Sequence, residues 1–167
     1  LNSMTGDLSD LGKAHQRSAE LAIKHINEVG GVGGFLVELI VKDTQTNATV
    51  GVDAANALVA EGVTAIVGAL ASSVTMSVAT TVSSQKNIVQ ISAASTSPAI
   101  TALADNDFLF STTVSDAFQG KVLARVAKEN YASAAVLYVN NPYGEGLAMQ
   151  FKETFEAEGG KVTAMVP

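Results

Sequence analysis

The sequence predicts an α/β fold, a parallel sheet covered by helices, from two observations. Apolar spacings typical of helices and of strands alternate along almost the whole chain of 167 residues. Each predicted strand leads through a short polar loop into the next helix. Strands separated by helices in this way pair in parallel, because the intervening helix returns the chain to the starting edge of the sheet.

The first predicted element is a helix over residues 10–29. Apolar residues recur there at three- and four-residue steps, while charged residues fall between them. Ser9 or Asp10 can cap its start, and Gly30 and Gly31 can end it. The apolar stripe is therefore predicted to face the core.

A strand and a second helix follow. Residues 36–43 are rich in β-branched side chains and are predicted as a strand, and residues 47–61 as a helix capped by Thr46 or Asn47. The later strands are predicted at 64–69, 88–92, 108–112, 134–139 and 161–166, and the later helices at 74–86, 98–103, 115–130 and 142–158. The segment 134–139 is almost wholly apolar, so helices are expected on both of its faces.

Composition and charge narrow the function classes. With 47% hydrophobic and 16% charged residues, the chain is too apolar to be disordered. Sixteen acidic residues against ten basic ones give a net charge of -6, the wrong sign for binding phosphate backbones, so no nucleic acid partner is expected. The absence of cysteine excludes disulfide scaffolds, thiolate metal sites and cysteine nucleophiles. The longest apolar runs are far shorter than the roughly 18 residues of a membrane span.

Enzyme signatures are also missing, so no catalytic residue, cofactor or metal is expected. His15 and His25 lie ten residues apart in one predicted helix, about 15 Å along its axis, which is too far for a metal pair. No serine lies in the Gly-x-Ser-x-Gly elbow of a hydrolase. The glycine run 30–34 follows a helix rather than a strand and has no Lys-Ser or Lys-Thr pair after it, so it predicts neither dinucleotide binding nor a P-loop.

The loops after two neighbouring strands are rich in hydroxyl groups. Ser72 and Ser73 follow one strand at the start of a helix, and the loop 94–97 follows the next strand. Ligands of an open parallel sheet bind outside the carboxyl ends of its strands. Hydroxyl groups and free backbone N–H groups beside a helix N-terminus suit a carboxylate. Taken alone, the commoner role of such residues is helix capping.

The order of several motifs identifies a resemblance that covers essentially the whole chain. In chain order, the motifs are Met4-Thr5-Gly6-Asp7-Leu8, Ile66-Val67-Gly68-Ala69-Leu70-Ala71-Ser72-Ser73, Ile91-Ser92-Ala93-Ala94-Ser95-Thr96-Ser97-Pro98, Ser115-Asp116-Ala117-Phe118-Gln119-Gly120 and Tyr143-Gly144-Glu145-Gly146. Together they resemble type I periplasmic solute-binding proteins of ABC importers, in the branched-chain amino acid (Leu/Ile/Val-binding) class.

The resemblance implies a set of ligand-binding residues. In proteins of this kind the two hydroxyl loops hold the α-carboxylate of the ligand, a main-chain carbonyl of the second loop accepts from its α-ammonium, and an aromatic residue from the second lobe covers it. The implied ligand-binding residues are Ser72, Ser73, Ala94, Ser95, Thr96 and Tyr143, with Leu11, Asp116 and Phe118 as further candidates. Leu11 stands where several relatives have an aromatic residue over the side-chain pocket.

The resemblance also implies a function. It is that of the extracytoplasmic or periplasmic substrate-binding component of an ABC transporter, which captures a small amino acid or related carboxylate between two lobes. The expected partners are that small-molecule ligand and an ABC permease in the membrane, with a lipid anchor as an option for the full-length protein. A ligand-sensing module of a receptor or kinase is an alternative, and a flavodoxin-like enzyme or regulator is a more distant one.

The same resemblance predicts how the chain is divided. Residues 1–115 are expected to form a Rossmann-like first lobe that lacks its first strand, and residues 116–167 part of a second lobe. The family has a strand before the Met4 motif and most of its second lobe beyond Pro167, including the acidic residue that completes ammonium recognition. We therefore expect either a portion of a protein about twice as long, or a chain that completes its sheet by exchange between copies and binds its ligand poorly alone.

Overall fold

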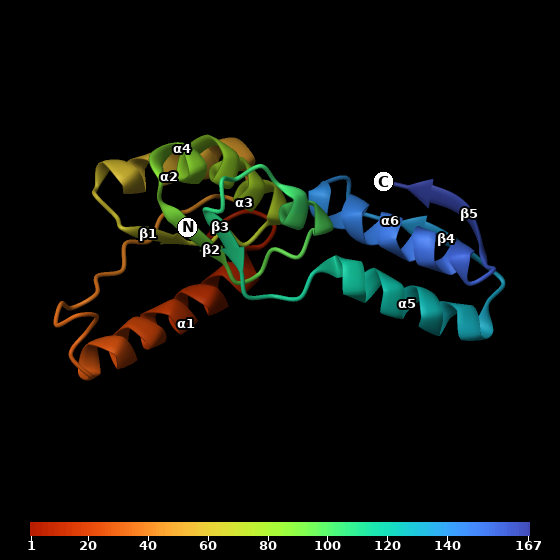
Figure 1. Ribbon diagram of the computed structural model, residues 1–167, viewed down its shortest axis with the longest axis horizontal. Helices are drawn as coiled ribbons and strands as arrows, with labels where there is room; N and C mark the ends of the chain where they lie inside the picture. The colour runs from red at the N-terminus through yellow and green to blue at the C-terminus, as the bar shows by residue number, and fades with distance from the viewer.

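The computed structural model describes all 167 residues and contains two parallel sheets (Figure 1). The first has the strand order β1 (Ala65–Val67), β2 (Val89–Ser92), β3 (Leu109–Ser111). The second pairs β4 (Ser133–Leu137) with β5 (Lys161–Val166). All the strand pairs within these sheets are parallel, which confirms the predicted α/β class.

Helices connect the strands as predicted. They are α1 (Ser9–Glu28), α2 (Ala48–Ala60), α3 (Ser72–Val78), α4 (Ser84–Lys86), α5 (Asp116–Asn130) and α6 (Pro142–Ala157). A π-helical turn, Ala79–Ser83, joins α3 to α4, and a 3-10 helix covers Pro98–Ala102. No helix has both the length and the hydropathy needed to cross a membrane.

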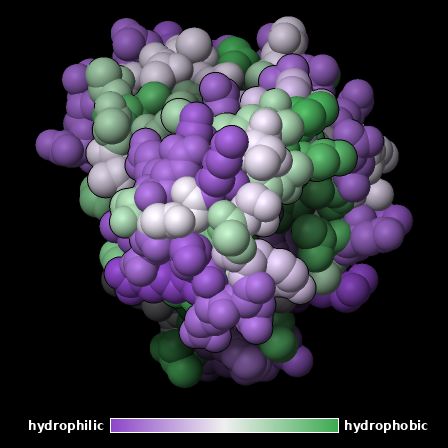
Figure 2. Space-filling model, turned by 90° about the vertical axis from the view of Figure 1, so that its right-hand side faces the viewer, coloured by the Kyte–Doolittle hydropathy of each residue, from purple (hydrophilic) through white to green (hydrophobic).

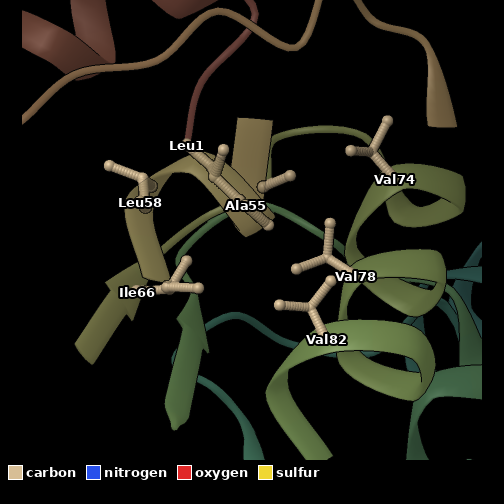
Figure 3. Packing of buried hydrophobic residues seen from close by; sticks show 8 residues of the cluster. Leu1, Ala55, Leu58, Ile66, Val74, Val78 and Val82 are labelled. Carbon is tan, nitrogen blue, oxygen red and sulfur yellow. The ribbon is translucent and has the colours of Figure 1, made fainter. Parts of the chain in front are cut away.

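The main core lies on the side of the first sheet that α2, α3 and α4 cover (Figure 1). In Figure 3, Leu58 of α2 and Ile66 of β1 face Val74, Val78 and Val82 of the helical run that starts at α3. All five side chains are buried. Burying an aliphatic side chain of this size contributes about 1.5 to 3 kcal/mol, so this cluster holds α2 and α3 against the sheet.

Residues 36–43 do not form the predicted strand, and this prediction is wrong. Its one ladder contact is the parallel bridge between Asp43 and Asn2, in which Asn2 N donates to Lys42 O and Thr44 N donates to Asn2 O. No strand lies beside the rest of the segment to accept its backbone hydrogen bonds. A β-rich sequence becomes a strand only where a neighbour pairs with it.

Helix α1 matches its predicted length, but its surroundings differ. Leu8, not Ser9 or Asp10, precedes the first helical turn, and no side chain caps it. The glycine stop is confirmed, since Gly31 N donates to Ile26 O. The predicted core-facing stripe is largely uncovered, with Val29 84% exposed, because α1 extends away from the sheet (Figure 1).

Helix α5 buries a different face from the one that its apolar spacing predicts. That spacing predicts that Phe118, Val122, Leu123 and Val126 point inward, but all four are exposed, and this prediction is wrong. Asp116, Gly120 and Ala124 are buried instead, at four-residue spacing. Gly120 lies on the side that approaches α6, where an added Cβ would overlap the Gln150 side chain. Small residues let the two helices pack closely side by side.

Strand β4 is not covered on both faces as predicted. Its residues alternate between exposed and half-buried, and Leu137 is 80% exposed. The end of the molecule formed by α5, α6, β4 and β5 shows hydrophobic residues gathered along one side (Figure 2). Helices therefore cover one face of this two-stranded sheet and leave the other open.

Candidate ligand-binding site

The loops that follow β1 and β2 lie side by side at the carboxyl edge of the first sheet. The β1 loop enters α3 at Ser72, and the β2 loop runs through residues 93–97 to the 3-10 helix. Ser97 N donates to Ser72 Oγ across 3.3 Å and so joins the two loops. The predicted juxtaposition of the two hydroxyl-rich loops is therefore present in the structure.

Buried hydroxyl groups fix the shape of these loops from below. Ser95 Oγ lies 2.7 Å from Thr75 Oγ1 and donates to Leu70 O, while Ser95 N donates to Ser92 Oγ. Gln90 Nε2 donates to Gly68 O. Because buried polar groups need hydrogen-bond partners, this network holds both loops in one arrangement. Ser95 serves that scaffold and does not line the cavity described next.

A cavity of about 690 Å³ opens beside the two loops. Ser72, Ser73, Ala94, Thr96 and Tyr143 line it, together with Leu11 of α1. Six of the nine residues named from the sequence thus meet at one place. Asp116 is buried beneath Thr96 instead, and Phe118 is 65% exposed beside Lys121, whose ammonium group lies 5.9 Å from the centre of its ring.

The remaining lining residues were not predicted from the sequence to bind a ligand. They are Asp7, Leu8, His15, Thr46, Leu70, Ala71, Gln119, Val139 and Asn141. His15 could have been found, because it lies four residues after Leu11 and therefore on the same side of α1. Gln119, Val139, Asn141 and Tyr143 come from α5, from the segment after β4 and from the start of α6, so the part of the chain after residue 115 also lines the cavity.

Ser72 and Thr96 present opposite hydrogen-bonding capacity. Ser72 Oγ accepts from Ser97 N, which leaves the Ser72 hydroxyl proton free for donation. Thr96 Oγ1 donates its proton to Asp116 Oδ2 across 2.6 Å, which leaves only acceptor lone pairs on Thr96. The cavity therefore has a donor at Ser72 and an acceptor at Thr96.

Asp116 is fully buried at the first turn of α5. Its backbone N–H donates to Thr96 O, its Oδ2 accepts from the Thr96 hydroxyl, and its Oδ1 has no hydrogen-bond partner. Burial raises the pKa of the Asp116 carboxyl, and the hydrogen bond from Thr96 offsets part of that rise. No Lys, Arg or His side chain forms an ion pair with it.

The start of α6 brings Tyr143 to the cavity. Asn141 caps this helix, its Oδ1 accepting from Tyr143 N at 3.1 Å and Gly144 N at 3.0 Å. Ser97 Oγ donates to Pro142 O at 2.7 Å and ties the β2 loop to the same turn. Tyr143 is 40% exposed, so its ring remains available to cover a bound molecule.

Asp43 positions the opposite rim of the cavity. Its carboxylate accepts from the Met4 and Thr5 backbone N–H groups, the Thr5 hydroxyl and the Gln45 N–H. Partial burial alone would raise the pKa of the Asp43 carboxyl, but these hydrogen bonds outweigh it and hold the pKa below its usual value. The loop fixed in this way continues to Asp7 and Leu8, which line the cavity.

Comparison with known proteins places the chain in a family. All residues, 1–167, match the model of the periplasmic binding protein family. The chain is 34% identical over 161 residues to the leucine-, isoleucine-, valine-, threonine- and alanine-binding protein of Pseudomonas aeruginosa, a match that covers 95% of this chain and 43% of the relative. It is 32% identical over 151 residues to the chemotactic signal transduction system substrate-binding protein BasB of Halobacterium salinarum, covering 86% of this chain and 36% of that protein.

A solved structure agrees with the sequence comparison. The branched-chain amino acid transporter substrate binding protein LivJ of Streptococcus pneumoniae, in complex with isoleucine, superimposes with a TM-score of 0.87 at 28% identity. That match covers 99% of this chain and 47% of LivJ. The chain thus spans less than half the length of these relatives. Its sequence, its fold and its paired loops agree that it belongs to the periplasmic binding protein family.

Proposed function

We propose that the cavity binds a small amino acid or related carboxylate, and that the native-length protein captures this solute outside the cytoplasm for an ABC permease. In this proposal residues 1–115 belong to one lobe and residues 116–167 begin a second, with the ligand between them. The observation that carries it is the convergence on one cavity of Ser72 at the start of α3, Thr96 in the β2 loop and Tyr143 at the start of α6.

The donor side of the cavity suits a carboxylate. Ser72 and Ser73 open a helical run whose first backbone N–H groups have no partner within the helix. Ser72 and Ser73 line the cavity, so the start of this run lies at its wall. Hydrogen bonds to a carboxylate contribute about 1.5 to 3 kcal/mol each, so two or three of them could hold a small anion group firmly.

Apolar residues complete the cavity. Leu8, Leu11, Leu70 and Val139 line it beside the Tyr143 ring. An aliphatic side chain placed among them would leave water and gain about 25 cal/mol for each Å² buried. This combination supports apolar or small amino acids as the ligand class.

A thermal-shift screen of the native-length protein against amino acids, small carboxylates, sugars and nucleobases tests the proposal. A ligand that binds only the folded state raises the melting temperature. At a concentration 100 times its Kd, it stabilises the folded state by about 2.7 kcal/mol. We expect shifts from apolar or small amino acids. Shifts from sugars or nucleobases alone would refute the carboxylate site. Mass spectrometry of the recovered ligand should show it unchanged, since no chemical step is proposed.

A sensing role is a second candidate, which the similarity to the chemotactic protein BasB supports. The same cleft would then pass the bound state to a receptor instead of releasing the solute into a permease. Uptake of the radiolabelled ligand distinguishes the two roles. Loss of uptake on deletion of the gene supports transport, whereas normal uptake with a lost chemotactic response supports sensing.

A further inference from the structure

We propose that Ser97 is a positioning residue that holds the Tyr143 side of the cavity against the two hydroxyl-rich loops. The inference rests on the proposed function and deepens it, because it names a contact outside the cavity that sets how tightly the ligand is retained. It depends on three observations: the hydrogen bonds of Ser97, its place behind the cavity wall and the close packing of α6 on the residue that follows it.

The first observation concerns the hydrogen bonds that Ser97 donates. Its backbone N–H donates to Ser72 Oγ at 3.3 Å, and its hydroxyl group donates to Pro142 O at 2.7 Å. Ser72 is the first residue of α3, and Pro142 is the first residue of α6, directly before Tyr143. Ser97 therefore connects the start of the helix that offers hydrogen-bond donors to the start of the helix that carries the aromatic ring.

The second observation concerns the place of Ser97. It is 2% exposed, and it does not line the cavity that Ser72 and Tyr143 line. Water and ligand therefore do not compete with Pro142 O for the Ser97 hydroxyl group. A typical hydrogen bond within a protein favours the bonded state by about two- to tenfold, so this one favours the arrangement in which α6 lies against the β2 loop.

The third observation concerns the packing beside this bond. Gly146 lies three residues after Tyr143 in α6, about one helical turn. A Cβ added to Gly146 would lie 2.7 Å from Pro98 Cδ and 3.4 Å from Ser97 Oγ. The glycine thus lets α6 approach closely enough for the Ser97 hydroxyl group to reach Pro142 O. Neither Pro98 nor Gly146 lines the cavity, so a bound ligand leaves this contact intact.

These contacts predict an effect that is the same for every ligand. Because they lie outside the cavity, they stabilise the closed arrangement of its walls and do not distinguish one ligand side chain from another. When only a fraction of the molecules has the binding-competent arrangement, the apparent affinity is reduced by that fraction. Loss of the Ser97 hydroxyl group lowers the fraction, so it should weaken all ligands by one factor and speed their release.

Ser97→Ala tests the inference on the native-length protein, with L-leucine, L-phenylalanine and L-alanine titrated calorimetrically. For each amino acid that binds the wild-type protein, we expect the Kd to rise by the same factor, about three- to tenfold. The release rate of the radiolabelled amino acid should rise with it. Ser84→Ala is the matched control, because it removes another buried serine hydroxyl group, one that donates to Thr80 O within its own helical run. This control should leave the Kd unchanged.

A double-mutant cycle with Tyr143→Ala separates positioning from a merely structural role. If Ser97 acts by placing Tyr143, Ser97→Ala should change the Kd by less than about twofold once the ring has been removed. A structural role would weaken binding by the same factor in both backgrounds, and that result would overturn the inference.

Gly146→Ala provides a second variant in case Ser97→Ala does not fold. Alanine favours the helix, but its Cβ would push α6 away from Pro98, so the Kd should again rise by one factor for all the amino acids that bind. An unchanged Kd in either variant, once it folds, or a loss confined to one amino acid, would overturn the inference and leave the proposed function standing. If none of the screened amino acids or carboxylates binds the wild-type protein, both the proposed function and the inference are wrong.

Discussion

The Thr96 hydroxyl group donates a 2.6 Å hydrogen bond to the buried Asp116 carboxylate, which lies twenty residues further along the chain. Thr96 follows the last residues of β2, and Asp116 opens α5, the first helix after the first sheet. The same loop reaches α6 through the bond from Ser97 Oγ to Pro142 O. The β2 loop thus lines the cavity and also contacts α5 and the start of α6. A change in this loop should therefore affect both the cavity and the position of these helices.

Removing both cavity hydroxyl groups should weaken ligand binding, and it should also lower stability, because Thr96→Ala takes away the hydrogen bond to the buried Asp116 carboxylate. For the amino acid that binds most tightly in the screen, Ser72→Ala combined with Thr96→Ala is expected to cost about 3 kcal/mol or more, since each charge-assisted bond contributes about 1.5 to 3 kcal/mol. Titration calorimetry measures the loss. Ser77→Ala, a change in the helical run outside the cavity lining, is the matched control and should bind normally. If the double variant bound the ligand about as tightly as the wild-type protein, the roles of Ser72 and Thr96 would be structural only.

Asp116→Asn should raise the melting temperature of the unliganded protein at pH 7. The folded-state pKa of Asp116 is raised, so its favourable contribution is complete only below the usual pKa of an aspartate and is lost as the pH rises through the raised value. At neutral pH the wild-type protein therefore keeps an unpaired buried charge that the amide variant lacks. Differential scanning calorimetry should show the difference in melting temperature between the variant and the wild-type protein shrinking as the pH falls to about 4. A variant that melts below the wild-type protein at pH 7 contradicts this reasoning.

Asp43 should show the opposite dependence on pH. Because its folded-state pKa is lowered, its contribution is present above the usual pKa of an aspartate and is lost as the pH falls through the lowered value. Asp43→Asn should accordingly melt at a lower temperature than the wild-type protein at pH 7, with the difference shrinking toward pH 3. Asp53→Asn, an exposed change on α2 at a carboxylate that accepts no hydrogen bond in the structure, provides the control. A difference that stays constant with pH would show that the Asp43 charge is not what holds the loop.

Gly120→Ala should destabilise the pair of helices α5 and α6. An added Cβ would lie 2.6 Å from Gln150 Cβ, so the helices would have to separate. Overpacking of this kind typically costs about 1 to 3 kcal/mol, although alanine is the better helix former. Gly33→Asn is the control, since space around Gly33 is open and asparagine tolerates its positive φ. Urea denaturation measures both, and an unchanged midpoint for Gly120→Ala would show that the interface yields without cost.

The loops that line the cavity could be predicted because their position follows from general rules. Strand and helix periodicities locate the ends of β1 and β2, and ligands of parallel sheets bind there, so the two hydroxyl-rich loops could be predicted. The resemblance to the family then singles out Ser72 and Thr96 within them. The bond between Thr96 and Asp116 could not be predicted from periodicity, because it depends on how α5 meets the first sheet. The buried face of α5 was missed for a related reason: the close approach of α6 selects Gly120 and Ala124 over larger apolar residues.

Segment 36–43 shows the limit of local propensity. Its β-branched residues favour a strand, but pairing requires a neighbour, and in the structure only Asp43 has one, at Asn2. The three- and four-residue spacing of apolar residues predicts that one side of α1 is buried. This spacing indicates which side of a helix can be buried, but not whether another element covers it. Both differences concern contacts between elements, which a single sequence pattern does not specify.

A crystal structure of the native-length protein with a bound L-amino acid tests the central claim most directly. We predict the carboxylate of the ligand within hydrogen-bond distance of Ser72 Oγ and the N–H groups at the start of α3, and its amine within hydrogen-bond distance of Thr96 Oγ1. Tyr143 should contact the ligand from the opposite side. A ligand bound with its carboxylate on Thr96 and its amine on Ser72, or bound outside this cavity, would contradict the account.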